Sequence, residues 1–326
     1  MRSTRLQNKR LMTQAGFFVL FVIAPPLDLF RFDLTLGHFF FLGVPWTLNL
    51  DAFIAGELTP TEAAVNLVIR GFIPLFLVGG ALIWTAWRFG RFYCGWLCPH
   101  FSVVEIINWL MYRASGKPSV WERTPLPRQQ PDGCCHEAER RLWPLVWLTA
   151  LFFAFLWAIV LLTYLLPPAE IYNNLFSGAL SPNQFRFLSV GTTLLFIEFM
   201  FARHLFCRFG CAVGLFQSLA WMGNDGGMVV AFDKSRAKAC SGCNNACDNV
   251  CPMRLKPRSI KRRMFTCTEC AQCISACGQV QSRMSSTSLL SWAQGTAARE
   301  VARGRPIGTS IESARRDTPV AAKGTE

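Results

Sequence analysis

Histidine is scarce in this chain, which has only four in 326 residues, and this scarcity limits the cofactors that it can bind. Haem iron in a helical bundle needs axial ligands such as histidine inside the apolar helices, and none of the four lies well inside a long apolar stretch. The motifs C-x-x-C-H, G-x-G-x-x-G and the P-loop are also absent. Haem, dinucleotide and nucleoside-triphosphate chemistry are therefore not expected. The four histidines are His38, His100, His136 and His204.

Charged residues are few, at 16% of the chain against 52% apolar residues, and this composition is too apolar for an ordinary soluble enzyme. Four apolar stretches are each long enough to cross a hydrocarbon core, which needs about 20 residues. They cover approximately residues 11–30, 63–87, 142–166 and 185–206. No small-residue cleavage site follows the first stretch, so we expect a retained anchor and not a signal peptide.

Acidic residues are outnumbered by basic ones, 20 to 33, which gives a net charge of +13. Thirty of the 33 basic residues fall in segments 1–10, 88–141 and 203–326, which a four-helix topology places on one side of the membrane. The positive-inside rule then predicts a multi-pass protein of the bacterial inner (cytoplasmic) membrane with both termini cytoplasmic. The basic surplus reflects topology and attraction to membrane lipid, and nucleic acid is not expected as a partner.

Cysteine, in contrast, is abundant, and eight of the 14 cysteines lie between positions 240 and 277. They form the runs C-x2-C-x3-C-x3-C-P and C-x2-C-x2-C-x3-C. The second spacing lets three thiolates of one short loop hold three corners of a [4Fe–4S] cluster, while the fourth cysteine usually binds the other cluster. We therefore assign one cluster to Cys240, Cys243, Cys247 and Cys277, and the other to Cys267, Cys270, Cys273 and Cys251.

Zinc and disulfides are the simpler alternatives for these eight cysteines. The pairs Cys240/Cys243 and Cys267/Cys270 would make a four-cysteine zinc ribbon, but the remaining four cysteines would have no role. Disulfides do not persist in the reducing compartment that the predicted topology implies. Iron–sulfur clusters are therefore the favoured interpretation.

Two further cysteine pairs, Cys94/Cys98 and Cys207/Cys211, have the spacing C-x3-C and follow the second and fourth apolar stretches. In a helix, residues i and i+4 share a face, so each pair is expected to present adjacent thiols, with His204 on the face of the second pair. The matching positions indicate a tandem repeat. Four converging thiolates could bind a third metal centre or copper, act as redox dithiols, or form disulfides. The simpler interpretation is buried packing.

Two other features could contribute to chemistry. Glu198 lies within the fourth apolar stretch, where a carboxylate is costly, and it could accept a proton from a quinol whose electrons pass to nearby metal. Alternatively, it could be a protonated glutamate bonded to neighbouring backbone. The loop tripeptide Cys134-Cys135-His136 could bind a soft metal ion, although a lone tripeptide is weak evidence.

These patterns predict an α-helical membrane protein with four transmembrane helices arranged as a tandem two-helix repeat. A cytoplasmic, bacterial 2[4Fe–4S] ferredoxin-like module of the α+β class follows. The expected order is a cytoplasmic N-terminus, a first membrane repeat with C-x3-C-P, a cytoplasmic loop, a second membrane repeat with C-x3-C, the ferredoxin-like module and a disordered tail. Their boundaries are 1–10, 11–112, 113–141, 142–222, 223–284 and 285–326.

The segment FYCGWLCP, the second C-x3-C and the closing pair of ferredoxin runs resemble the membrane-bound 4Fe–4S polyferredoxin family over about residues 10–284. That family includes NapH-type quinol dehydrogenase subunits, the CcoG/FixG/RdxA proteins and the membrane part of NosR. The resemblance implies transfer of electrons from a membrane donor, a quinol, to a partner redox protein such as an iron–sulfur or cytochrome subunit. The alternative that it implies is a copper-reducing or cbb3-type oxidase assembly factor of the CcoG kind.

The sequence also departs from the family pattern. Ala212 follows Cys211 where the family has proline, and the first ferredoxin run is one residue longer than usual. No fifth apolar stretch follows the cysteine runs, which favours the NapH type over the CcoG type.

Overall fold

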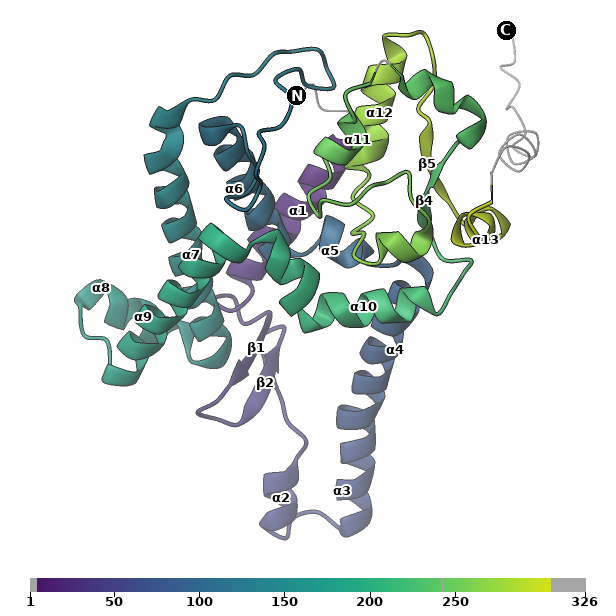
Figure 1. Cartoon of the computed structure of the whole chain (residues 1–326). Helices are drawn as coiled ribbons and strands as arrows, with labels where there is room; N and C mark the ends of the chain where they lie inside the picture. Colours follow the sequence, from purple (N-terminus) through teal and green to yellow (C-terminus); the bar gives the residue numbers. More distant parts are fainter. Residues whose placement is uncertain (1–4, 242, 306–326) are drawn as a thin grey trace, which may run out of the picture.

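The computed structural model describes residues 5–241 and 243–305, which form apolar helices and a cysteine-rich module (Figure 1). Among these residues, three helical runs are long and apolar enough to cross a membrane: Pro60–Phe89, Arg140–Leu165 and Pro182–Ala202. They coincide closely with the second, third and fourth apolar stretches of the sequence. The helical membrane protein expected from the sequence is thus supported, whereas the four-helix repeat stays a prediction.

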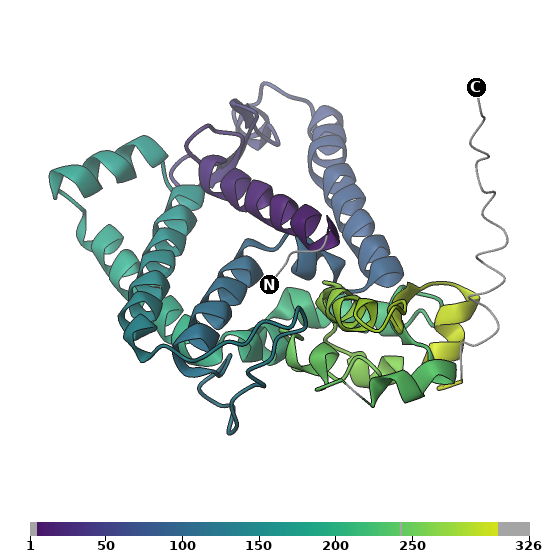
Figure 2. The ribbon, with the colours of Figure 1, turned by 90° about the horizontal axis from the view of Figure 1, so that it is seen from above.

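The first apolar stretch differs from its expected bounds. Helix α1 covers Arg5–Ile23 and not residues 11–30. It ends before Pro25 and Pro26, because a proline has no backbone N–H to continue the helical hydrogen bonds. Its charged N-terminal turns enter the protein, where Arg10 and Gln14 are buried. Figure 2 shows α1 between α4 (Ile73–Phe89) on one side and α6 (Pro99–Ser115) and α7 (Trp143–Leu165) on the other.

A small antiparallel sheet follows α1 at the end of the molecule remote from the cysteines. Its strands pair in the order β1, β2, β3, and β1 is anchored by Asp33, whose buried carboxylate accepts a hydrogen bond from Arg31 at 2.6 Å. A short helix, α2, leads on to the second apolar run. The bounds are β1 Phe30–Asp33, β2 His38–Phe41, β3 Val44–Trp46 and α2 Leu50–Ile54.

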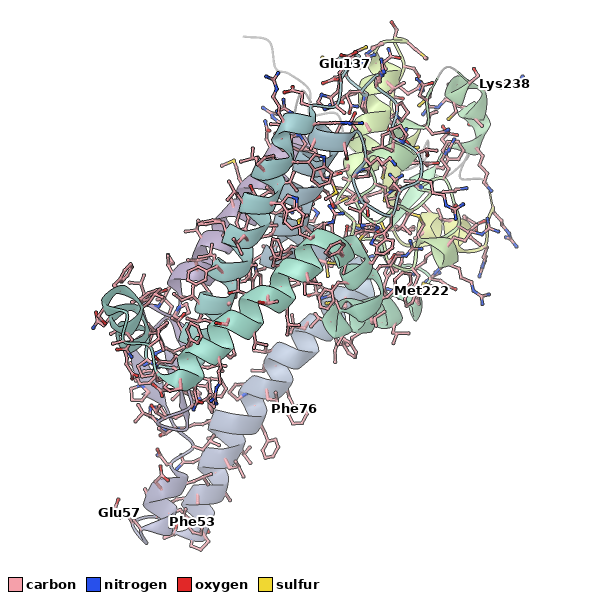
Figure 3. The ribbon with its side chains drawn as sticks, turned by 60° about the vertical axis from the view of Figure 1, so that its left-hand side comes forward. Phe53, Glu57, Phe76, Glu137, Met222 and Lys238 are labelled. Carbon is pink, nitrogen blue, oxygen red and sulfur yellow. The ribbon has the colours of Figure 1, made fainter. Side chains whose placement is uncertain are left out.

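The second apolar run is continuous through α3 (Pro60–Asn66), a π-helical segment (Leu67–Phe72) and α4 (Ile73–Phe89). Thr59 begins it with a reciprocal capping box to Glu62, which satisfies backbone N–H groups at the helix start. None of its apolar window is buried in the protein. Side chains such as Phe76 project away from the rest of the molecule, as a lipid-facing helix requires (Figure 3).

The third and fourth runs pack against each other. Helix α7 (Trp143–Leu165) follows a 3-10 turn (Arg140–Leu142), and α9 (Pro182–Ile197) continues into a π-helical turn (Glu198–Ala202). A stripe of alanines at i, i+4 spacing on α7 is fully buried, and Gly191 of α9 would place a Cβ 3.5 Å from Ala158. Small residues let the helix backbones approach closely, as is typical of membrane bundles. Helix α8 (Pro168–Ser177) connects them.

The cysteine-rich module begins after α10 (Ala212–Met222) and is built on two paired strands. Strand β4 (Val229–Phe232) runs antiparallel to β5 (Leu290–Ala293), so that the two ends of the module meet. Between them lie 3-10 segments and short helices. These are Lys234–Cys240, α11 (Ala246–Asn249), Lys261–Met264 and α12 (Gln272–Ser282).

The prediction that residues 285–326 form a disordered tail is wrong for the first part of this segment. Residues 290–293 form β5, and α13 (Thr296–Ala302) follows and contributes the buried side chains Ala298 and Val301. The sequence analysis missed these elements because each is too short to show apolar periodicity, and they are stabilised by packing on β4. Residues 306–326 of the expected tail lie outside the described residues.

Candidate functional site

The eight clustered cysteines separate into two groups of four. Cys240, Cys243, Cys247 and Cys277 line one small cavity, and Cys251, Cys267, Cys270 and Cys273 line another. Each cavity combines thiols from both runs, because α12 carries Cys277 back toward the first run and the chain after α11 carries Cys251 toward the second. The structure therefore brings together the same two sets of four that the spacing predicts.

The second cysteine run folds around its cavity because two of its residues have left-handed backbone conformations. Glu269 and Ala271 both have left-handed φ values, of 50° and 56°, which turn the chain between successive cysteines. Glu269 is fully buried and accepts a hydrogen bond from the indole N–H of Trp292 at 3.1 Å. Burial raises the pKa of Glu269 to about 8, which makes its protonated form available at neutral pH.

The chemistry of the donor sets fits [4Fe–4S] clusters. Each set offers four sulfur ligands around a cavity, and backbone N–H groups point at two of the sulfurs, from Leu255 to Cys251 and from Leu289 to Cys277, at 3.3 Å each. Such N–H···S bonds tune cluster potentials. Burial raises the pKa of Cys251 to about 12, so its proton is lost readily only when a metal replaces it.

The sequence analysis expected the two cysteines of each C-x3-C pair to share one helix face. The structure instead places them in two different elements. Cys94 lies in the short helix α5 (Phe92–Trp96), whereas Cys98 is the N-cap of α6 (Pro99–Ser115). Pro99 explains the break, because a residue preceding proline is disfavoured in the helical conformation. Cys207 and Cys211 have the same arrangement: a π-helical turn (Phe206–Gly210) carries the first, and the second is the N-cap of α10 (Ala212–Met222).

The four thiols of these pairs nevertheless lie near one another at the junction of helices and module. They are close enough for each to act electrostatically on others of the set. Burial raises the pKa of Cys98 to about 12. Within residues 5–241 and 243–305, however, no three cysteine, histidine or acidic side chains are grouped closely enough to hold a single metal ion.

Arg91 is the cation of this junction and was not identified as a site residue from the sequence. Its side chain is 1% exposed and donates to the backbone oxygen of Cys207 at 2.6 Å, while two of its nitrogens, Nε and Nη1, have no partner among the described residues. A Cβ at Gly214 would lie 2.1 Å from its Nη2, so a larger residue there would displace the guanidinium. In the sequence, Arg91 is one of several basic residues that follow the second apolar stretch, so no pattern distinguishes it as a site residue.

Glu198 begins the π-helical turn after α9, and its carboxylate lies 3.4 Å from the ring nitrogen Nε2 of His100. Both side chains are largely buried, and His100 packs against the rings of Phe199 and Phe206. The sequence analysis missed His100 as a partner of Glu198, because the two residues are 98 positions apart. π-helical segments of this kind occur frequently at functional sites.

The remaining sequence-based candidates are the loop tripeptide and His204. Cys134 and Cys135 are exposed in the loop after α6, and His136 packs on the ring of Tyr112 with centroids 5.1 Å apart. His204 is buried and begins the helical segment that carries Cys207, because the positive φ of 43° at Arg203 ends the preceding π-helical turn. Burial and the neighbouring Arg203 lower the pKa of His204 to about 4, so it is neutral at pH 7.

Comparison with known proteins relates the chain to iron–sulfur proteins. Residues 70–118, which contain Cys94 and Cys98, match the 4Fe–4S binding domain family Fer4_5. The chain is 24% identical over 249 residues to Escherichia coli (strain K12) YccM, whose name describes it as a candidate electron transport protein. That alignment covers 72% of this chain and 60% of YccM.

A second similar protein is MJ0749 of Methanocaldococcus jannaschii, an uncharacterized protein. It is 25% identical over 224 residues, which is 65% of this chain and 75% of the relative. No solved structure matches the chain. The matching 4Fe–4S domain, the similarity to YccM and the apolar helices support a relationship to membrane-type 4Fe–4S ferredoxins.

Proposed function

We propose that this protein carries electrons between a membrane donor, a quinol, and a partner redox protein through two [4Fe–4S] clusters. The observation that supports it most is the pair of four-thiol cavities in a module attached to apolar helices. Cys240, Cys243, Cys247 and Cys277 would bind one cluster, and the second set of four cysteines would bind the other. The partner would be another iron–sulfur or cytochrome subunit, as for NapH-type proteins.

The membrane arrangement that we propose has four helices in two repeats, with α1 as the first. It is supported by the equivalent placement of the two C-x3-C pairs, each with its second cysteine capping the helix that follows. The distribution of basic residues supports our proposal that the termini and the ferredoxin-like module lie in the cytoplasm, at the bacterial inner membrane.

The C-x3-C region contacts the second cysteine run directly. A Cβ at Gly95 would lie 2.1 Å from the backbone oxygen of Thr268, and the Trp96 indole donates to the backbone oxygen of Glu269 at 3.1 Å. Electrons entering near the membrane therefore have a short protein path from the Cys94 loop to the second cysteine run. The four thiols could serve as redox dithiols on this path or bind a third metal centre.

Glu198 is our proposed proton acceptor for the quinol. Oxidation of a quinol to quinone releases two electrons and two protons. Each cluster would take one electron, Glu198, with His100 at 3.4 Å, would receive one proton, and the second proton would be released to solvent. We expect Glu198→Gln to lower the quinol-dependent rate at least tenfold without loss of iron. Glu170→Gln on α8 serves as the matched control, and an unchanged rate in Glu198→Gln would remove this residue from the mechanism.

The first test of the function is EPR of anaerobically purified, oxidised protein in lipid, before and after addition of a quinol analogue. We expect new signals of reduced [4Fe–4S] clusters. If dithionite reduces the clusters and no quinol does, the quinol part of the proposal is wrong.

The alternative function is reduction of Cu(II) to Cu(I) by the clusters, with thiolates holding the soft product. The proximity of four thiols at the helix–module junction and the exposure of Cys134 and Cys135 favour it. It predicts stoichiometric Cu(I) binding that is lost when Cys94 and Cys207 are replaced by serine. Retention of all copper by that double variant would count against it.

A further inference from the structure

A cavity of about 420 Å³ lies between α6, the loop that follows α6 and the ferredoxin-like module. Pockets of about 300–1,000 Å³ are the usual size for small ligands and cofactors. Its wall includes Cys243 and Cys251, one cysteine from each four-thiol set. A ligand in this cavity would therefore contact the ligand shells of both proposed clusters at once.

The wall formed by α6 presents two aromatic rings, Trp109 and Tyr112. The ring of His136 packs on Tyr112, and the Tyr112 hydroxyl accepts a hydrogen bond from Gln130, so the ring is fixed from two sides. Flat rings held in this way favour a planar aromatic ligand, which can stack on them.

Two buried polar side chains line this cavity. Asn108 Oδ1 is buried, and no hydrogen-bond donor of the described residues reaches it. His204 lines the same cavity with 6% of its surface exposed. Buried polar atoms are usually satisfied, so the open acceptor of Asn108 in a cavity indicates a ligand that carries a hydrogen-bond donor.

Positive charge also lines this cavity. Arg254 is paired with Glu122 at 2.6 Å, whereas Arg283 donates to the backbone oxygen of Pro131. The guanidinium of Arg283 could therefore attract an anionic group at the edge of the cavity, such as a phosphate or a ring oxygen carrying charge.

We propose that this cavity binds a planar aromatic two-electron carrier, a quinone or flavin ring, that exchanges electrons with both clusters. The inference rests on the proposed function, because it needs the two clusters. The oxidised ring takes one electron from each reduced cluster and two protons from solvent, and it becomes the hydroquinone while both clusters become oxidised. In the reverse reaction, the hydroquinone gives one electron to each oxidised cluster and releases two protons to solvent. Each cluster exchanges one electron. A ring in contact with both clusters can therefore exchange the two electrons that it needs.

This is a second site, distinct from the surroundings of Glu198. His100 lies in the first turn of α6, whereas Asn108 lies eight residues later, about 12 Å along the helix at 1.5 Å per residue. The Glu198 side would thus serve the membrane donor, and the cavity would serve a carrier at the module.

The test uses protein in lipid whose clusters are reduced with dithionite, after removal of excess reductant, so that it does not depend on quinol oxidation. Flavin mononucleotide and menadione are the two probes. Binding is measured by tryptophan fluorescence, and electron transfer by loss of the cluster EPR signal with appearance of the reduced ring. We expect saturable binding of one probe and oxidation of both clusters.

Variants then locate the binding. Asn108→Leu replaces the unpartnered amide with an apolar side chain in the cavity, and we expect at least tenfold weaker binding of the probe. Asn173→Leu, at an exposed position of α8, is the matched control and should bind as the parent does. If Asn108→Leu loses its clusters, Trp109→Leu repeats the test at a half-exposed position.

The outcomes distinguish a flavin from a quinone as the ligand of the cavity. Binding of flavin mononucleotide that weakens in Arg283→Gln identifies a soluble flavin, and binding of menadione alone identifies a quinone. Absence of binding of both probes, or unchanged binding in Asn108→Leu, would overturn the inference. Absence of clusters from the parent protein, seen from iron content before a probe is added, would instead refute the proposed function, while fluorescence would still report whether the cavity binds.

Discussion

At the residue scale, one glycine sets the distance between the C-x3-C loop and the ferredoxin-like module. Gly95 lies between the cysteines of the first pair, and its Cα faces the backbone oxygen of Thr268 so closely that no side chain fits. The neighbouring Trp96 then reaches the backbone of Glu269. This contact can form only if residue 95 has no Cβ, which gives the glycine of FYCGWLCP a structural reason.

We predict that Gly95→Ala destabilises the protein and lowers its iron content. The new Cβ would lie 2.1 Å from the Thr268 oxygen, so the loop and the module must separate, and overpacking of this kind costs about 1–3 kcal/mol. Iron per chain and thermal unfolding in detergent measure the effect. Gly80→Ala in α4, where a Cβ meets nothing within 4 Å, is the control. Equal iron content and unfolding temperature in both variants would contradict this account.

Lys261 provides a pH-dependent prediction. Its buried ammonium donates to the backbone oxygens of Trp221, at 2.9 Å, and Asn224, and burial lowers its pKa to about 8 from 10.5. Between these two values the unfolded chain binds more protons than the folded one, so this group adds stability as the pH rises from 8 toward 10.5. Below pH 8 its contribution is constant.

We therefore expect the unfolding temperature of the parent, relative to Lys261→Met, to rise as the pH increases from 8 to 10. Differential scanning fluorimetry of both proteins in the same detergent measures this difference. A difference that stays flat over this interval, or falls, would show that Lys261 is not the titrating group.

At the scale of elements, a buried network joins α1, α6 and α12. Arg10 of α1 forms an ion pair with Glu105 of α6 and donates to the Gly95 oxygen at 2.7 Å. Gln272 of α12 donates to the other oxygen of Glu105 at 2.7 Å. Because these partners come from three helices, the network fixes α12 of the module against α1 and α6.

We predict that Glu105→Ala lowers the free energy of unfolding by about 3–5 kcal/mol, because it leaves the guanidinium of Arg10 buried without its counter-charge. Glu139→Ala is the control, since its pairs with Arg113 and Arg141 are exposed and contribute about 0–1 kcal/mol. Denaturant unfolding followed by tryptophan fluorescence compares the two. A loss in Glu105→Ala no larger than in the control would show that the network is not important for stability.

At the scale of the whole molecule, the chain is extended between two ends of different character. Figure 3 shows Phe53 and Glu57 at one end and Glu137 and Lys238 at the other. Exposed apolar side chains cover the helices between them, among them Leu75, Phe76 and Leu148. This arrangement suits a protein whose apolar helices associate with a membrane.

We expect a membrane-impermeant maleimide to label exposed Cys134 and Cys135 in inverted membrane vesicles and not in intact spheroplasts. In a Cys134→Ser/Cys135→Ser background, Glu57→Cys should give the opposite result. Mass spectrometry of labelled peptides reads both. Labelling of residues 57 and 134 from the same side would show that the proposed topology is wrong.

The sequence anticipated much of the site, because its chemistry is local. The thiols of each cysteine run are a few residues apart, so their spacing alone indicates which sets of four can share a cavity, and the structure gathers the same sets. The pairs Cys94/Cys98 and Cys207/Cys211 were expected on helix faces, but the second cysteine of each pair is the N-cap of a new helix, which a simple i, i+4 count does not detect.

The sequence by itself determined the apolar helices, the two cysteine runs and the excess of basic residues, since these depend on composition and short spacings. Only the tertiary structure decided that Glu198 meets His100, that Arg91 is buried among thiols, and that a cavity touches both cysteine sets. It also placed β5 against β4 in a segment without periodicity. These features join residues far apart in the chain, and the contacts between them depend on packing geometry that no local pattern encodes.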